Sequence, residues 1–147
     1  PDTQIEKKLF KLKDMKDNEI RVTLGDGKLK IINFWALWCA PCKREMRSLN
    51  RIKELIQNDS LEVIAVAAGR NNLEKINTFF YENDLSLLRS LRDPYGKLSS
   101  TLGILGLPTT LIIDPTGNEI GRIIGDIDWS SEKSINFFQL VIDKYNL

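Results

Sequence analysis

The chain has 147 residues, of which 42% are hydrophobic and 28% are charged, and its formal net charge is +1. This length fits one domain with its own hydrophobic core, and the composition is typical of a globular protein. The charge balance argues against a nucleic-acid-binding protein, and no apolar run approaches the roughly 20 residues that a membrane-spanning helix needs.

Residues 1–27 are predicted to form an N-terminal extension or hairpin, which ends in a turn at Gly25-Asp26-Gly27. The first eight residues are polar and charged, and they contain neither a hydrophobic signal segment nor a methionine. This start is typical of a mature or trimmed chain, and an export signal or membrane anchor that preceded it would not be visible in these residues. The remaining residues, 28–147, are predicted to form the core of one continuous domain.

The first half of the core predicts a βαβ unit. Ile31–Ala36 is apolar, β-branched and aromatic, as is typical of a buried central strand. Pro41–Gln57 places its apolar residues on one face of a helix, and Leu61–Ala68 is a second buried strand. Strands joined through a helix in this way run parallel to each other.

The second half continues with alternating helices and strands. The Asp114-Pro115-Thr116-Gly117 turn predicts an antiparallel hairpin. The pattern as a whole predicts an α/β fold, in which helices cover both faces of a mixed sheet. The expected elements are a helix opening at an Asn71–Glu74 capping box, a strand at Ser86–Leu91, a short helix at Lys97–Leu102, strands at Thr109–Ile113 and Glu119–Gly125, and a last helix capped by Ser131.

The cysteine content points to redox chemistry. The chain has two cysteines, three positions apart, and no histidine. A disulfide that closes so small a loop takes little entropy from the unfolded chain, so the pair makes a poor structural staple. A closed zinc site needs four nitrogen or sulfur ligands, and this chain offers only two thiolates and carboxylates. We therefore expect no bound metal and no cofactor.

Cys39 is expected to lie at or just before the start of a helix. Pro41 suits the first helical turn because it lacks an N–H group, and the free N–H groups at a helix start stabilise an anion. The Cys39 thiol should therefore have a lowered pKa and act as the nucleophile, while Cys42, one turn further in, resolves the mixed disulfide. A lone C-x-x-C pair could also be half of a zinc site, but its place between strand and helix favours redox chemistry.

Two motifs resemble the thioredoxin superfamily, specifically the TlpA/ResA/CcmG-like branch of extracytoplasmic thioredoxins. Residues 33–45 read Asn-Phe-Trp-Ala-Leu-Trp-Cys-Ala-Pro-Cys-Lys-Arg-Glu, and residues 106–110 read Gly-Leu-Pro-Thr-Thr. The resemblance implies a thioredoxin fold with an N-terminal extension and a βα insertion. It also implies a cis peptide at Pro108 and a substrate-binding surface made by Trp38, Leu107, Pro108 and Thr109. Without the cysteine motif, Pro108 could equally be an ordinary proline at the start of a strand.

Asn33 stands where classical thioredoxins carry a buried aspartate, so the proton acceptor for Cys42 has to come from elsewhere. Glu45 lies three residues after Cys42, on the same helical face, and resembles the glutamate of the ResA-like branch. We predict that Glu45 is partly buried, has a raised pKa and helps to deprotonate Cys42, with Asn33 and Pro41 supporting the site. The alternative is a glutamate that faces solvent.

The resemblance implies an enzyme that exchanges dithiol for disulfide with protein partners. The branch works outside the cytoplasm, generally as a reductant, with clients in cytochrome c maturation or in copper delivery and oxidase assembly. Electrons arrive from a membrane protein of the DsbD or CcdA type. We accordingly expect a monomer in the periplasm or another extracytoplasmic space, either free or anchored through a segment that preceded residue 1.

Three other functions compete with this one. One is a thiol oxidase or isomerase of the DsbA or DsbC type, and another is a non-enzymatic thioredoxin-like module that binds a partner or copper. The third, a peroxide-reducing relative, is disfavoured because Ala36-Leu37-Trp38 precedes the first cysteine in place of a Thr/Ser-Thr-x-x pattern.

Overall fold

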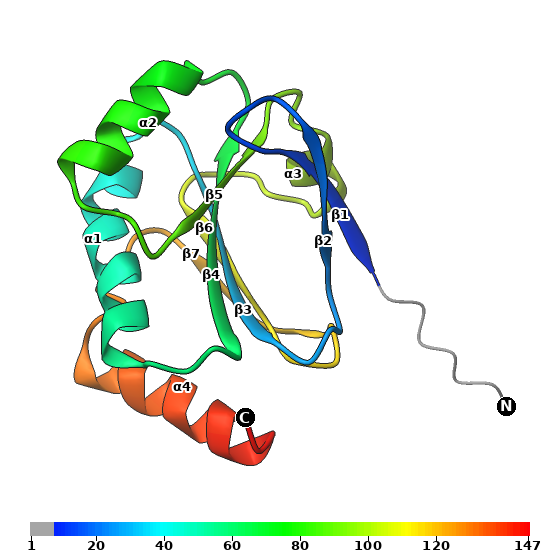
Figure 1. The fold of residues 1–147 in the computed structure, drawn as a ribbon, viewed down its shortest axis with the longest axis vertical. Helices are drawn as coiled ribbons and strands as arrows, with labels where there is room; N and C mark the ends of the chain where they lie inside the picture. Colours follow the sequence, from blue (N-terminus) through cyan, green and yellow to red (C-terminus); the bar gives the residue numbers. More distant parts are fainter. Residues whose placement is uncertain (1–7) are drawn as a thin grey trace, which may run out of the picture.

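A computed structural model of the chain describes residues 8–147, so the first seven residues of the predicted N-terminal extension lie outside the described part. Figure 1 shows the arrangement of the helices and strands. The strands are β1 (Leu9–Lys13), β2 (Glu19–Thr23), β3 (Leu29–Trp35), β4 (Leu61–Ala68), β5 (Arg89–Asp93), β6 (Thr109–Ile113) and β7 (Glu119–Ile124). The helices are α1 (Ala40–Leu55), α2 (Leu73–Glu82), α3 (Lys97–Thr101) and α4 (Glu132–Lys144).

The strands form one mixed sheet in the order β2-β1-β5-β4-β3-β6-β7. β3, β4 and β5 run parallel, whereas β6 pairs antiparallel with β3 and with β7. Every residue of β3 is buried, because this strand lies inside the sheet and both of its faces are covered. The predicted βαβ unit and the predicted hairpin are therefore confirmed.

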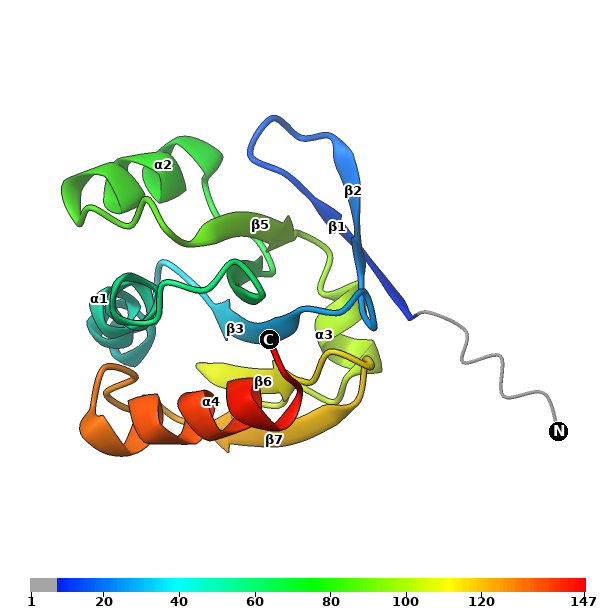
Figure 2. The ribbon, with the colours of Figure 1, turned by 60° about the horizontal axis from the view of Figure 1, so that its bottom comes forward.

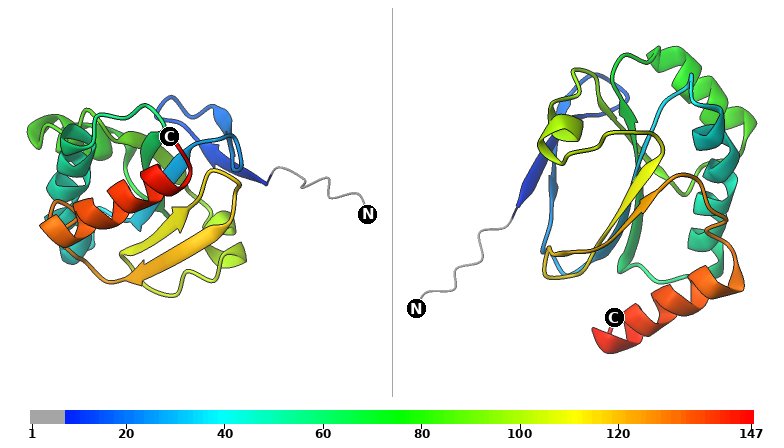
Figure 3. Two further views of the ribbon diagram at one scale, coloured as in Figure 1. Left: turned by 90° about the horizontal axis from the view of Figure 1, so that it is seen from below. Right: turned by 180° about the vertical axis from the view of Figure 1, so that it is seen from behind.

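Helices cover both faces of the sheet, as predicted. α1, α2 and α4 lie on one face, whereas α3 lies on the other (Figures 1, 2 and 3). The β1–β2 hairpin forms the edge of the sheet beyond β5, and its buried side chains pack on the same side as α3. The apolar side chains of the sheet alternate between the two layers: Ile31 and Trp35 pack with the first, and Ile32 and Phe34 with the second. Among residues 8–147, no helix is both long enough and apolar enough to cross a lipid bilayer.

Several predicted boundaries differ from the observed ones. The strand expected at Ile31–Ala36 lies at Leu29–Trp35, and the helix expected at Pro41–Gln57 lies at Ala40–Leu55. The strand expected at Ser86–Leu91 lies at Arg89–Asp93 instead. The helix expected to open at Asn71 begins at Leu73, and its N-cap is Asn72, whose side chain accepts a hydrogen bond from the backbone nitrogen of Lys75 at 3.0 Å. Asn71 is not available as a cap, because its side chain bonds to other parts of the backbone.

Candidate active site

Cys39 and Cys42 form a disulfide at the start of α1, with their Cα atoms 5.3 Å apart. Cys39 is the N-cap residue of the helix, and its sulfur accepts a hydrogen bond from the backbone nitrogen of Cys42 at 3.3 Å. Cys39 is 5% exposed, whereas Cys42 is fully buried at 0%. The predicted positions of both cysteines are confirmed, and Cys39 is the sulfur that lies nearer to solvent.

The loop between β3 and α1 is fixed by hydrogen bonds at two points. The backbone nitrogen of Cys39 donates to the carbonyl oxygen of Ala36 at 3.1 Å. The backbone nitrogen of Leu37 donates to Oδ1 of Asn71 at 2.8 Å, and Nδ2 of Asn71 donates to the carbonyl oxygens of Ala68 and Gly69 at 3.0 and 3.3 Å. Asn71 therefore ties the loop before Cys39 to the end of β4.

Trp38 directly precedes Cys39, and 72% of its surface is exposed. An indole in this position can contact a partner protein, and its place in a substrate-binding surface stays a prediction. Trp35 is fully buried and packs against Phe79 and Phe80, with ring centroids 5.5 and 5.7 Å away. Trp35 thus belongs to the core.

The loop before β6 reaches the same edge of the sheet as the cysteines. Thr109 at the start of β6 pairs with Phe34 near the end of β3, so the two loops leave the sheet at the same end. The Leu107–Pro108 peptide bond is cis, as the resemblance implied. Leu107 packs against the core cluster that contains both cysteines.

The predicted substrate-binding residues of this loop differ in their exposure. Leu107 is half-buried, whereas Pro108 and Thr109 are buried. The hydroxyl of Thr109 donates to the carbonyl oxygen of Gly106 at 2.7 Å, and the carbonyl oxygen of Pro108 accepts from the backbone nitrogen of Gly125 at 2.8 Å. The Thr109 side chain therefore stabilises the loop, and the substrate-binding role of the loop stays a prediction.

Glu45 is buried, with 3% of its surface exposed. Oε1 accepts from Nδ2 of Asn33 at 2.6 Å, and Oε2 accepts from the backbone nitrogen of Ile127 at 3.2 Å and from Nε1 of Trp129 at 3.0 Å. Burial raises the pKa of Glu45, these hydrogen bonds lower it in part, and the negative charge of Asp126 raises it further. The predicted burial and the direction of the pKa shift are confirmed.

Asn33 connects Glu45 to the sheet. Its Nδ2 atom also donates to Oγ1 of Thr110 at 2.9 Å. Its Oδ1 atom is buried and has no hydrogen-bond partner among the residues that the structure describes. Asn33 cannot accept a proton as an aspartate would, so Glu45 carries the carboxyl group nearest to Cys42 along α1.

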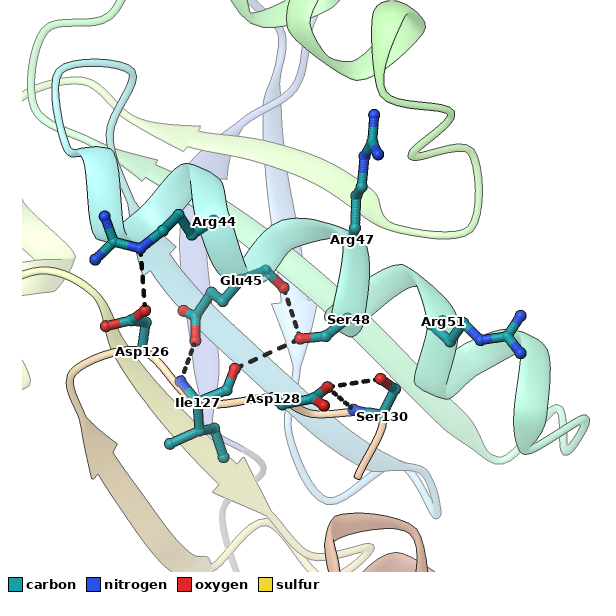
Figure 4. Close-up of a pocket in the computed structure, with 9 residues that line it drawn as sticks. All are labelled: Arg44, Glu45, Arg47, Ser48, Arg51, Asp126, Ile127, Asp128 and Ser130. Atoms are coloured by element: carbon teal, nitrogen blue, oxygen red, sulfur yellow. Dashed lines mark hydrogen bonds and ion pairs between the residues drawn. The ribbon is translucent and has the colours of Figure 1, made fainter. Parts of the chain in front are cut away.

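Glu45 borders a hollow of about 420 Å³ that lies between α1 and the segment joining β7 to α4 (Figure 4). The guanidinium of Arg44 forms an ion pair with Asp126 across its mouth, at 3.6 Å. Arg47 and Arg51 also line the hollow, and Figure 4 shows both side chains pointing away from Glu45.

Sequence reasoning missed Trp129 and Asn71 as parts of this site. The indole nitrogen of Trp129 donates a hydrogen bond to Glu45, which lies 84 positions earlier in the chain. No local spacing links residues so far apart in the chain.

In residues 8–147, no group of three or more histidine, cysteine, aspartate and glutamate side chains is arranged to hold a metal ion.

A model of the AhpC/TSA family matches residues 5–118 of the chain. The thiol:disulfide interchange protein HelX of Rhodobacter capsulatus is 34% identical over 104 residues, which are 71% of this chain and 56% of HelX. The thiol-disulfide oxidoreductase ResA of Bacillus thuringiensis is 32% identical over 124 residues, which are 84% of this chain and 65% of ResA. The chain thus spans less than two thirds of the length of these relatives.

Solved structures share the fold. StoA of Bacillus subtilis is 22% identical, with a TM-score of 0.69 over 95% of this chain and 97% of StoA. The exposed lipoprotein thioredoxin of Streptococcus pneumoniae is 23% identical, with a TM-score of 0.70 over 92% of this chain and 99% of that protein. The expected thioredoxin fold is therefore confirmed.

Proposed function

The chain belongs to the AhpC/TSA family, and from this premise we propose that it is a thiol–disulfide oxidoreductase that exchanges dithiol for disulfide with protein partners. The observation that carries the proposal is the Cys39–Cys42 disulfide at the start of α1, with the buried carboxyl group of Glu45 on the next turn of the same helix. The relatives named thiol-disulfide oxidoreductases support it.

In the proposed reaction, the reduced protein transfers two electrons to a client disulfide. The Cys39 thiolate attacks one client sulfur, so a mixed disulfide forms and the second client sulfur leaves as a thiolate that takes up a proton. The Cys42 thiol then gives its proton to the Glu45 carboxylate, and its sulfur attacks Cys39. The Cys39–Cys42 disulfide forms, and the first client sulfur leaves as a thiolate.

We propose that the physiological direction is reduction of the client. Ala40 and Pro41 separate the cysteines, and the chain has no histidine, the residue that strong periplasmic oxidants commonly place between them. Equilibration with glutathione or dithiothreitol measures the reduction potential. We expect a value nearer to the roughly −270 mV of thioredoxin than to the roughly −120 mV of DsbA, and a value near the latter would make the protein an oxidant.

We further propose that the protein works outside the cytoplasm as a monomer. Its proposed clients are proteins of cytochrome c maturation or of oxidase assembly. A membrane protein of the DsbD or CcdA type would supply the electrons. These proposals rest on the resemblance of residues 33–45 and 106–110 to the TlpA/ResA/CcmG-like branch. A Cys42→Ser variant, which lacks the resolving sulfur, should hold a client as a mixed disulfide that can be identified.

Reduction of insulin disulfides tests the activity itself. The wild-type protein should accelerate the reduction by dithiothreitol, and the Cys39→Ser variant should not. The Cys42→Ser variant should be nearly inactive while accumulating mixed disulfides. Equal rates for the wild-type protein and the Cys39→Ser variant would overturn the proposed function.

A further inference from the structure

The segment that joins β7 to α4 is fixed to α1 next to Glu45. Ser48 lies one turn after Glu45, and its hydroxyl oxygen accepts from the backbone nitrogen of Trp129 at 3.0 Å. The backbone nitrogen of Ile127 donates to Oε2 of Glu45 at 3.2 Å (Figure 4). These contacts place the Trp129 side chain against the Glu45 carboxyl group.

Trp129 is a large side chain that is almost fully buried, at 1% exposed. Its ring packs against Phe138 of α4, with the ring centroids 6.2 Å apart, so the indole has a fixed orientation. The Nε1 atom lies 3.0 Å from Oε2 of Glu45. An indole N–H can donate but cannot accept, and it bonds more strongly to a carboxylate than to a carboxylic acid.

The charged groups around Glu45 come from α1 and from the segment after β7. Asp126 opposes ionisation of Glu45, although Arg44 neutralises part of its charge through their ion pair. Asp128, Arg47 and Arg51 line the same hollow. β3 and β6 contribute only the neutral side chains of Asn33 and Thr110. Asn33, Ile127 and Trp129 are therefore the hydrogen-bond donors that favour the ionised form.

We propose that Trp129 is a positioning residue for proton transfer: its indole N–H favours the ionised form of Glu45 and holds its carboxyl group in the orientation that accepts the proton of Cys42. This inference rests on the proposed function, in which Glu45 takes that proton. It adds a residue from the far end of the chain to the site that the sequence predicted from residues 33–45 and 106–110.

The first test uses the unmodified, oxidised protein. Its three tryptophans give three indole ¹⁵N–¹H resonances, which can be followed as the pH is raised. The Trp129 resonance should move with the same midpoint as the side-chain carbon of Glu45, and Glu45→Gln should abolish the movement. Trp35 provides the internal control, because its buried Nε1 atom has no partner among the described residues. If the chemical shift of the Trp129 indole did not change as Glu45 ionises, the inference would be overturned.

The second test compares Trp129→Phe with Trp35→Phe. Both substitutions shorten a buried indole to a phenyl ring, but only the first removes a hydrogen bond to Glu45. On the acid side of the pH–rate profile for insulin reduction, Trp129→Phe should be about threefold to tenfold slower than the wild-type protein. The two rates should converge at alkaline pH, where Glu45 is ionised in both proteins.

Trp35→Phe should keep the shape of the wild-type profile. An unchanged profile for Trp129→Phe, or an equal change in both variants, would contradict the inference while leaving the proposed function intact. Loss of insulin reduction in the wild-type protein would instead contradict the proposed function. If Trp129→Phe does not fold, the indole titration of the unmodified protein still decides the inference.

Discussion

The side-chain nitrogen of Asn33 lies 2.6 Å from Oε1 of Glu45, so the central strand donates a hydrogen bond to the helix that carries both cysteines. Both side chains are buried. Burial penalises the charged form of a carboxyl group, and in Glu45 this penalty exceeds the effect of the three hydrogen bonds, so the pKa is raised. Ionisation of Glu45 is therefore less favourable in the folded protein than in the unfolded chain, and this should be visible in the stability of the protein.

We expect the stabilising contribution of Glu45 to fall with increasing pH. Because its pKa in the folded protein is above the ordinary value of 4.5, the folded state binds the proton more tightly than the unfolded state. The contribution is complete below about 4.5 and is lost as the pH rises through the raised value. Urea unfolding of the oxidised protein at a series of pH values should show Glu45→Gln gaining stability relative to the wild-type protein over this window.

Glu54→Gln is the matched control, because Glu54 is an exposed glutamate on the same helix. Subtracting its effect from that of Glu45→Gln removes the general effect of exchanging a glutamate for a glutamine on α1. The amide introduced by Glu45→Gln can be accommodated, since the unpartnered Oδ1 of Asn33 can turn to accept a hydrogen bond from it. A pH-independent effect of Glu45→Gln would show that the carboxyl group ionises as freely in the folded protein as in the unfolded one.

The two cysteines should differ in reactivity once the disulfide is reduced. The backbone N–H of Cys42 points at the sulfur of Cys39, and Cys42 itself has no exposed surface. Iodoacetamide at neutral pH should therefore modify Cys39 at least about tenfold faster than Cys42. Peptide mass spectrometry after short labelling times identifies the modified residue. Unfolding in urea is the control, since it should abolish the difference, and faster labelling of Cys42 would reverse the assigned roles.

The pattern of apolar residues in the sequence correctly predicted the strands that are themselves rich in buried apolar residues. Leu61–Ala68 and Thr109–Ile113 were predicted with their observed boundaries, because each is a run of buried apolar residues that ends at turn-forming residues. β5 was misplaced because its sequence, Arg-Ser-Leu-Arg-Asp, is mostly polar. Arg92 can be buried there only because Asp14 and Asp17 of the N-terminal hairpin accept its hydrogen bonds, and that contact is invisible in a local pattern.

The same distinction applies to the site. The cysteines, Pro41 and Glu45 lie within seven positions, so helix geometry relates them directly. Trp129 meets Glu45 only because the segment after β7 folds back onto α1. The position of the Pro108 loop beside the cysteines came from the resemblance, and the antiparallel pairing of β3 with β6 gives its physical reason.

Gly25 and Gly27 offer a comparison within one turn. Both have positive φ angles, +77° and +88°, so alanine at either position should cost about 1–2 kcal/mol in backbone energy. A Cβ atom on Gly25 would also lie 2.9 Å from the carbonyl oxygen of Thr116, whereas one on Gly27 would meet nothing within 4 Å. Gly25→Ala should therefore lower the free energy of unfolding by more than Gly27→Ala. If both variants lost the same free energy of unfolding in urea, the turn at Gly25 would not lie as close to the turn at Thr116-Gly117 as the structure shows.

Asn71 and Asn72 are adjacent residues of the same type whose side chains bond to different elements. Asn71 accepts from Leu37 in the loop before Cys39, whereas Asn72 caps α2. Asn72→Ala loses one hydrogen bond to the backbone and should cost about 1 kcal/mol of unfolding free energy, whereas Asn71→Ala loses three and should cost more. The two variants are therefore compared under conditions in which both are fully folded, so that any difference in activity reports the order of the loop that presents Cys39.

We therefore expect Asn71→Ala to reduce insulin disulfides severalfold more slowly than the wild-type protein, and Asn72→Ala to reduce them at the wild-type rate. The reason is that the unbonded N–H of Leu37 would free the Leu37–Trp38 segment to adopt other conformations, in which Cys39 is less well placed for attack. Asn71→Asp keeps an acceptor for Leu37 but sets a carboxylate against the carbonyl oxygens of Ala68 and Gly69, so it should restore only part of the rate. Equal rates for the two alanine variants would mean that the chain between β3 and α1 holds its conformation without Asn71.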